Sequence, residues 1–286
     1  MAIGDIIVGI DIGTSKVSTV VGEVNNFKQI EIICNTCCRC NGMAKGQIID
    51  GDAISIAISK TIREAEEIAN FKISSAYITI PGKYTTIVQN SVVKETKDRF
   101  DGISYKDVVS ALSSVKEIEM PDDEVLIDII PDKFILEDGK TVEDPVGSYC
   151  SSFTLMAQLI LADKDYIKKI TNICRRAGIE IDGIVPITLA ERNLVLDGSE
   201  MNDNVMILDI GAGNTEIGIF KGNSFIFNDT LPLGGDNITS DIAYVLNISK
   251  EEADKLKRQY GLALKSFIDN DNNIILNTYN GGDTRN

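Results

Sequence analysis

The sequence contains no histidine among its 286 residues. Without histidine, Ser–His and Cys–His nucleophilic systems and imidazole metal sites are excluded. Long hydrophobic runs are also missing, because no stretch approaches the roughly 18 apolar residues that a membrane-spanning helix needs. Residues 1–13 lack the basic flank and cleavage site of a secretory signal peptide. We therefore expect a cytosolic protein whose chemistry rests on carboxylates, lysines, hydroxyls and backbone amides.

Basic residues are few relative to acidic ones: 28 against 43, which gives a formal net charge of −15. Nucleic-acid phosphates are bound by clustered lysine and arginine, so this balance argues against a nucleic-acid partner. It also argues against attraction of this chain to anionic lipid. Hydrophobic residues make up 43% and charged residues 25% of the chain. This composition is typical of a soluble globular protein, and the length suffices for two ordinary domains.

Cysteine occurs mainly in one short cluster, CNTCCRC. The six cysteines are Cys34, Cys37, Cys38, Cys40, Cys150 and Cys174. Thiolates at such short spacing can ligate zinc, but a tetrahedral site usually takes two short pairs separated by a longer loop. No second pair follows, so we interpret the cluster as reduced thiols on a strand and loop of a cytosolic protein.

The N-terminal region predicts a two-stranded hairpin followed by a third strand and a helix. The apolar stretch 6–12 ends at a small polar turn, Gly-Thr-Ser, and a second apolar stretch covers 17–24. This pattern is typical of a β-hairpin. Apolar residues at helical spacing predict a helix over 52–70 with Asp52 as its N-cap. Strands are also expected at 29–34 and at 75–81, where a Pro-Gly turn follows.

Residues 83–160 change character and predict a small α+β insert outside the main sheet. Strands are expected at 84–94 and 123–136, with a helix over 104–118 that Ser104 can cap. The main alternation of strands and helices is expected to resume with residues 152–162. The further predicted elements are helices at 163–177, 237–247 and 249–260, a helix opened by Pro186, strands at 179–185, 205–210, 215–220 and 224–232, and one short strand in the polar tail 269–286.

The opening pattern returns about 200 residues later, where VMILDIGAGNTEIGIF echoes IIVGIDIGTSKVSTVV. Each copy is an apolar strand that ends in Asp-Ile-Gly, a small polar turn and a second strand. A single turn of this kind is usually just a hairpin. Two copies with an acidic residue at the matched strand end predict two related halves whose turns face one nucleotide.

The residue types in the two turns suit a polyphosphate. Glycines let the backbone approach a ligand closely, and turn amides form an anion-binding nest. Asp11 and Asp209 end the two strands, and two carboxylates can face phosphates only if a cation lies between them. Mg²⁺ with part of its water shell fits, and either carboxylate could also orient an attacking water. The further candidate phosphate contacts are Gly13, Thr14, Ser15, Lys16, Gly211, Ala212, Gly213, Asn214 and Thr215.

A third segment is a candidate for the adenosine side of such a site. Gly234 and Gly235 follow a strand and a proline, and can bring backbone against phosphate or ribose. Asp254 and Lys257 lie three residues apart on one face of a predicted helix, where they could hold ribose and purine edges. The alternative interpretation, a solvated helix face with an ordinary ion pair, remains open.

These motifs, in the order GIDIGTSK, LDIGAGNTEIGIF, PLGGDNITSDIA and EADKLKRQYG, resemble the actin superfamily, and the FtsA family within it. The insert resembles the FtsA subdomain called IC, which actin, MreB and heat-shock chaperone ATPases lack. The resemblance implies an α/β, actin-like (ribonuclease H-like) two-lobed fold with an α+β subdomain inserted in the first lobe. It implies ATP and Mg²⁺ in the cleft, with the residues named above as contacts. At most slow ATP hydrolysis is expected, because no strong general base is visible.

The chain departs from the family pattern at several positions. Ala212 stands in the second turn where many relatives have a third glycine, and Asn214 replaces a usual hydroxyl residue. Asp254 stands where glutamate is commoner, and Val185 precedes Pro186 where the family often has Glu-Pro. We expect nucleotide binding to survive these changes more readily than hydrolysis.

The resemblance implies a division of the chain and a role in cell division. The expected parts are subdomain IA at 1–82 and 161–199, the IC-like insert at 83–160, subdomain IIA at 200–233 and part of subdomain IIB at 234–286. FtsA-like proteins polymerise and link FtsZ filaments of the Z-ring to the cytoplasmic membrane at the septum. Expected partners are therefore the FtsZ tail, further copies of the chain and other division proteins. The final GGDTRN resembles the middle of the family pattern, so the FtsZ-docking helices and the amphipathic membrane helix are expected beyond it, in a longer protein unless this is a shortened relative.

The sequence is also compatible with two other functions. GIDIGTSK also resembles the opening of carbohydrate kinases of the same superfamily, which need a sugar pocket and an Asp at the reacting hydroxyl. A PilM-like pilus adaptor is the other alternative. The IC-like insert favours FtsA over the kinase.

Overall fold

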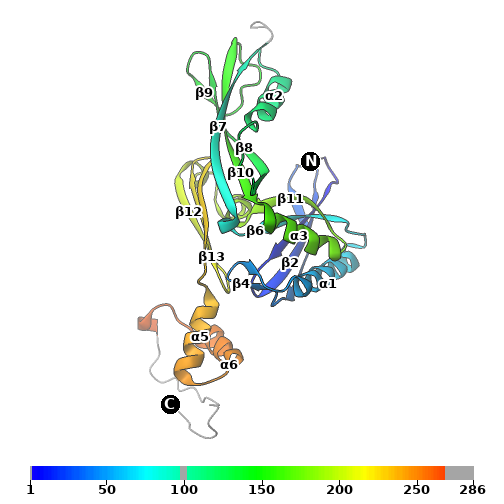
Figure 1. Ribbon diagram of the computed structural model, residues 1–286, viewed down its shortest axis with the longest axis vertical. Coiled ribbons are helices and arrows are strands. Elements are labelled where there is room, and N and C mark those ends of the chain that lie inside the picture. Colours follow the sequence, from blue (N-terminus) through cyan, green and yellow to red (C-terminus); the bar gives the residue numbers. More distant parts are fainter. Residues whose placement is uncertain (1, 97–101, 268–286) are drawn as a thin grey trace.

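The computed structural model describes residues 2–96 and 102–267 (Figure 1). The strands are β1 (Ile6–Ile12), β2 (Lys16–Val24), β3 (Ile30–Arg39), β4 (Met43–Ala44), β5 (Gln47–Ile48), β6 (Ser75–Ile80), β7 (Thr85–Glu95), β8 (Glu124–Leu136), β9 (Thr141–Val142), β10 (Ser152–Asp163), β11 (Glu180–Pro186), β12 (Asn204–Ile210), β13 (Thr215–Lys221) and β14 (Ser224–Leu231). The α-helices are α1 (Gly51–Ala69), α2 (Tyr105–Val115), α3 (Lys164–Arg176), α4 (Ile187–Val195), α5 (Gly235–Leu246) and α6 (Lys250–Tyr260). Short 3-10 helices are η1 (Gly82–Tyr84), η2 (Glu200–Asn202) and η3 (Lys265–Phe267). The short strand expected within 269–286 lies outside the described residues.

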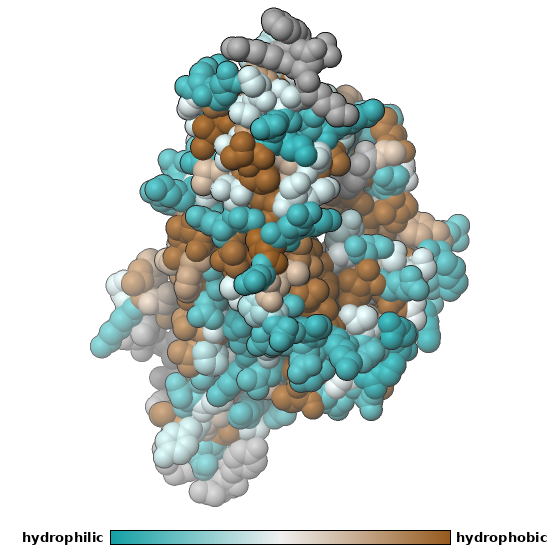
Figure 2. Space-filling view, turned by 45° about the horizontal axis from the view of Figure 1, so that its top comes forward, coloured by the Kyte–Doolittle hydropathy of each residue, from teal (hydrophilic) through white to brown (hydrophobic). Residues whose placement is uncertain are grey.

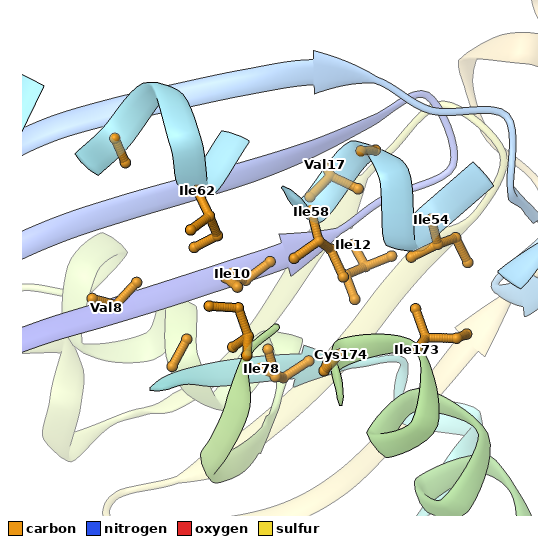
Figure 3. Close-up of a cluster of buried hydrophobic side chains, with 14 of the residues drawn as sticks. Val8, Ile10, Ile12, Val17, Ile54, Ile58, Ile62, Ile78, Ile173 and Cys174 are labelled. Carbon is orange, nitrogen blue, oxygen red and sulfur yellow. The ribbon is translucent and has the colours of Figure 1, made fainter. Parts of the chain in front are cut away.

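The first lobe is a five-stranded sheet with the order β11-β6-β1-β2-β3. β1 and β2 form the predicted antiparallel hairpin, and β6 runs parallel to β1. Helices α1 and α3 pack on the sheet, and their apolar faces meet alternate side chains of β1 and β2 (Figure 3). Ile10, Ile58 and Ile78 are almost completely buried in this core. The parallel strands end at the same edge of the sheet as the turn after β1, which holds that turn against a rigid base.

The start of α1 differs from the prediction that Asp52 is its N-cap. The cap is Asp50, whose backbone is extended and whose Oδ1 accepts hydrogen bonds from the amides of Asp52 and Ala53, both at 3.0 Å. A capping residue must precede the first turn to reach those free amides. Asp52 already lies within the turn, and its carboxylate contacts Arg176 instead.

The insert is a four-stranded sheet with the order β7-β10-β8-β9, and α2 packs on β7 and β10. Ser104 caps α2 as predicted, in a capping box with Asp107. Strand β10 was expected to resume the main alternation, which is wrong: it pairs antiparallel with both β7 and β8 at the centre of the insert's sheet. Its nearly continuous apolar run suits a central strand that is buried on both faces.

The second lobe contains the three-stranded sheet β12-β13-β14 and the helices α5 and α6, which pack on each other. β12 and β13 form a hairpin with Asp209 opposite Glu216. Alternate side chains of β12 on one face, Met206, Leu208 and Ile210, are about half or more exposed. Hydrophobic residues also gather across the middle of the face seen in Figure 2. In Figure 1, α5 and α6 lie beyond the end of this sheet, away from the insert.

All six cysteines are free thiols. On β3 their side chains alternate between the two faces, so Cys34 is buried and Cys37 is exposed. Across residues 2–96 and 102–267, no three His, Cys, Asp or Glu side chains are placed to hold a metal ion together. No helix in these same segments is both long and apolar enough to cross a bilayer.

The capping geometry gives a prediction about stability. We expect Asp50→Ala to lower the free energy of unfolding by about 0.5–2 kcal/mol, since two amides of α1 lose their acceptor. Asp52→Ala, which loses only an exposed ion pair, should cost less than about 1 kcal/mol. Urea unfolding followed by circular dichroism measures both. A larger loss in Asp52→Ala than in Asp50→Ala would contradict the assignment of the cap.

Candidate functional site

The two hairpin turns, 13–16 and 211–214, have the same local structure. The amide of Gly13 donates to the carbonyl of Lys16, and the amide of Gly211 donates to the carbonyl of Asn214, each at 2.9 Å. A Cβ on Gly13 would lie 3.1 Å from the Lys16 carbonyl oxygen, and one on Gly211 would lie 3.0 Å from that of Asn214. The repeat seen in the sequence is therefore a repeat of backbone geometry, which favours glycine at the same place in both turns.

The turns meet each other across the two lobes. The Thr14 hydroxyl donates to Asn214 Oδ1 at 3.1 Å. A Cβ on Gly213 would lie 2.6 Å from Thr14 Cγ2, so the backbone of one turn is in contact with the side chain of the other. Residues 200 positions apart in the sequence are thus in direct contact.

The third segment joins the second turn. The amides of Gly235 and Asp236, at the start of α5, donate to the carbonyls of Gly211 and Ala212 at 3.0 and 2.7 Å. A Cβ on Gly234 would lie 2.5 Å from the Ala212 carbonyl oxygen, so only glycine fits there.

Lys257 connects α6 to this corner of the site. Its Nζ donates to the Gly235 carbonyl at 3.0 Å and to the Thr239 hydroxyl at 2.7 Å. Asp254 forms ion pairs with Lys257 at 3.1 Å and Arg258 at 2.7 Å, and these contacts lower the pKa of its carboxyl. The structure thus places Lys257 beside Gly235, where its ammonium group binds α5. Asp254 contacts Lys257 and Arg258, both on its own helix.

The remaining predicted contact residues differ in whether their polar groups already have hydrogen-bond partners within the protein. Ser15 and Lys16 are exposed at the tip of the first hairpin. The Thr215 hydroxyl donates to the Leu233 carbonyl at 2.8 Å, which commits its hydrogen to the backbone. Asp11 Oδ1 accepts a hydrogen bond from the Thr79 hydroxyl at 2.7 Å, which holds that carboxylate at the end of β1.

Four carboxyl groups gather near the turns, and sequence reasoning identified only Asp11 and Asp209. Burial, followed by repulsion from Asp11, raises the pKa of Asp209. Glu191, on α4, has its pKa raised from 4.5 to about 7, first by burial and then by Asp209, Asp11 and Glu216. Its Oε2 is buried and has no hydrogen-bond partner among the described residues. Two features of the sequence could have pointed to the other two carboxyl groups: Glu216 directly follows Thr215, and Glu191 lies in the helix opened by Pro186.

Glu216 is 1% exposed, and both oxygens of its carboxylate accept hydrogen bonds. Oε1 accepts from Asn214 Nδ2 at 2.5 Å, while Oε2 accepts from the Gly82 amide at 2.8 Å and the Thr230 hydroxyl at 2.7 Å. Burial nevertheless raises the pKa of this carboxyl. The group therefore sits at the contact between the second turn and the start of the insert.

The donor set suits a divalent cation that keeps most of its water. Asp11 and Asp209 lie at matched strand ends, and their mutual repulsion marks an excess of negative charge that a cation would neutralise. No third protein ligand joins them among the described residues, so a cation bound there would take the rest of its coordination shell from water and phosphate oxygens. Mg²⁺ is bound in that way in nucleotide sites.

Comparison with solved structures identifies the class of protein. The PilM–PilN type IV pilus biogenesis complex matches with a TM-score of 0.60 at 17% identity, over 89% of this chain and 70% of that one. The ethanolamine utilization protein EutJ from Carboxydothermus hydrogenoformans matches with a TM-score of 0.51 at 14% identity, over 90% of this chain and 62% of that one. The chain has the actin-like fold, which confirms the predicted two-lobed fold class.

Family models place the chain more closely. The model for the SHS2 domain inserted in FtsA matches residues 82–161, and the model for cell division protein FtsA matches residues 206–286. FtsA of Bacillus subtilis is 30% identical over 91% of this chain and 59% of its own length; FtsA of Escherichia coli K12 is 28% identical over 96% and 65%. The chain belongs to the FtsA family. It spans about two thirds of the length of these relatives, and the comparisons do not favour the kinase or pilus-adaptor alternatives.

The pKa of Glu191 gives a prediction about pH. Its carboxyl binds its proton more tightly in the folded chain, with a pKa of about 7 against 4.5 ordinarily. The folded state then holds more protons between these two values, so stability falls as pH rises through this window and levels off above about pH 7. We expect Glu191→Gln to raise the melting temperature at about pH 8 and to reduce the drop between about pH 5 and pH 8.

Thermal unfolding without nucleotide or divalent cations measures this effect. Glu67→Gln, on the exposed side of α1, is the matched control and should keep the wild-type pH dependence. Part of the drop should remain in Glu191→Gln, because the pKa values of Asp209 and Glu216 are raised as well. An unchanged pH profile in Glu191→Gln would show that this carboxyl does not titrate in the window.

Proposed function

We propose that this chain provides the Mg·ATP-binding site of an FtsA cell division protein, with the phosphates between the turns 13–16 and 211–215. The observation that carries the proposal is the pair of turns with identical glycine geometry, which come from opposite lobes and touch at Thr14 and Asn214. Turn amides and hydroxyls bind phosphate oxygens, and exposed Lys16 supplies a positive charge for the β- or γ-phosphate. The start of α5, with Gly234 and Gly235, faces the adenosine side.

Mg²⁺ would be held through water by Asp11 and Asp209, and when bound it neutralises phosphate charge. Asp11 is oriented for this by Thr79. Lys257 is held against Gly235 and Asp254, so it shapes the adenosine side chiefly by fixing the start of α5. Hydrolysis is slow in this proposal, since Val185 stands where relatives often place glutamate. ATP then serves mainly as a ligand that sets the relative position of the two lobes.

The cellular role proposed here follows from membership of the FtsA family. The protein polymerises, binds the C-terminal tail of FtsZ and other division proteins, and links FtsZ filaments to the cytoplasmic face of the membrane at the septum. A membrane helix beyond these residues would provide the anchor. A pull-down with FtsZ tail peptide, using the protein as its cell produces it, tests the partner: capture no better than with a scrambled peptide would contradict the link.

Nucleotide binding is tested by calorimetry with Mg·ATP. We expect Asp209→Ala and Lys16→Ala each to weaken binding by roughly 1–3 kcal/mol, because each removes a charged hydrogen-bonding group from the cleft. Lys140→Ala, on the β8–β9 turn of the insert, removes an exposed lysine far from the turns and should bind like wild type. Equal affinity of all four proteins would contradict the two-turn site.

A further inference from the structure

The clearest feature that the nucleotide site leaves unexplained is the link between Glu216 and the base of the insert. The insert leaves the first lobe at residues 82–85, which comprise η1 and the first residue of β7. We call these four residues the junction. Both Oε2 contacts of Glu216 concern this junction: the Gly82 amide donates directly, and the Thr230 hydroxyl that donates to Oε2 accepts from the Lys83 amide at 3.0 Å. Glu216 thus holds two successive backbone amides, that of Gly82 directly and that of Lys83 through Thr230.

The other oxygen of the same carboxylate holds the second turn. Asn214 Nδ2 donates to Oε1, and Asn214 Oδ1 accepts from Thr14 of the first turn. Every link from Thr14 to Gly82 is therefore a direct hydrogen bond, through Asn214 and Glu216 alone. A buried carboxylate that loses a donor bears a large desolvation cost, so these contacts respond to one another.

The junction itself has little room to adjust independently. A Cβ on Gly82 would lie 2.8 Å from the Asn228 side chain and from the Asp229 amide nitrogen, so β14 packs directly against the junction backbone. Asn228 Nδ2 also donates to the Thr85 hydroxyl at 2.8 Å. Tyr84 stacks on Tyr166 of α3 with ring centroids 3.8 Å apart. A shift of β13 and β14 relative to the first lobe must therefore displace the junction.

We propose that Glu216 is a positioning residue that couples the two turns to the insert, so that a nucleoside triphosphate bound between the turns alters how the junction is held. The inference rests on the proposed function and adds the regulation of that same site. The turns touch at Thr14 and Asn214, so a phosphate group can enter between these side chains only by parting them. Asn214 then changes its contact with Glu216, and the carboxylate passes the change to the amides of Gly82 and Lys83.

Hydrogen–deuterium exchange at residues 82–86, with and without saturating Mg·ATP, tests the coupling. Saturation is set for each protein by calorimetry, so an altered affinity does not enter the comparison. In wild type we expect nucleotide to change exchange protection at the junction by at least about fivefold, the lower end of typical coupling between linked sites. In Glu216→Gln, which keeps the shape but leaves one acceptor oxygen for three donors, at least one of these contacts is lost and this change should vanish.

Gln158→Met is the matched control. Gln158 is a buried residue of β10 whose Oε1 accepts from the Phe225 amide at 2.8 Å, so it joins the insert to the second lobe without touching either turn. The nucleotide-dependent change at 82–86 should persist in this variant. If Glu216→Gln does not fold by circular dichroism, Thr230→Val removes the hydroxyl between Glu216 and the Lys83 amide and should likewise abolish the change at residue 83.

The outcomes separate the two proposals. A wild-type protein that binds Mg·ATP without a change at the junction overturns the coupling and leaves the nucleotide site intact. A change that survives in Glu216→Gln at saturation also overturns it. Failure of wild type to bind Mg·ATP overturns the proposed function and the coupling with it. Loss of the change in Glu216→Gln but not in Gln158→Met supports the role of Glu216.

Discussion

The carboxylate of Glu216 lies out of contact with water where the two lobes and the insert meet, and a buried charge is costly unless it is hydrogen-bonded. Those donors come from the second turn, from β14 and from the first residue of the insert. The requirement places β13 against the junction, which brings the turn before β13 against the turn after β1. The relative position of the lobes, and the contact of Thr14 with Asn214, thus depend on satisfying one side chain.

Much of this arrangement could be predicted because local sequence patterns indicate it. Alternating apolar residues, glycines at matched positions and a terminal aspartate predict two equivalent hairpins, and both have the same turn hydrogen bond. The helices over α3, α5 and α6 were predicted to within about two residues, since their caps and apolar spacing are plain in the sequence. That the two turns face each other was predicted from their recurrence about 200 residues apart, and the family resemblance added the identity of the insert.

The parts that could not be predicted depend on contacts between distant residues. Asp50 and Asp52 are equally good caps by composition, and only the backbone conformation separates them. Strand β10 looks like a strand of the main sheet because a buried central strand has the same apolar run in either sheet. Glu191 is an ordinary helical glutamate until folding places it beside Asp209 and Asp11. The residues that surround a site from other elements are the ones that single-sequence reasoning misses.

The stacked pair of Tyr84 and Tyr166 has an optical consequence. The chain contains no tryptophan and eight tyrosines, so tyrosine fluorescence is not quenched by energy transfer to an indole. Two of the phenol rings are stacked at the root of the insert, one on η1 and one on α3. Any movement that separates them changes their mutual quenching, so the protein carries an unlabelled fluorescent reporter where the insert joins the first lobe.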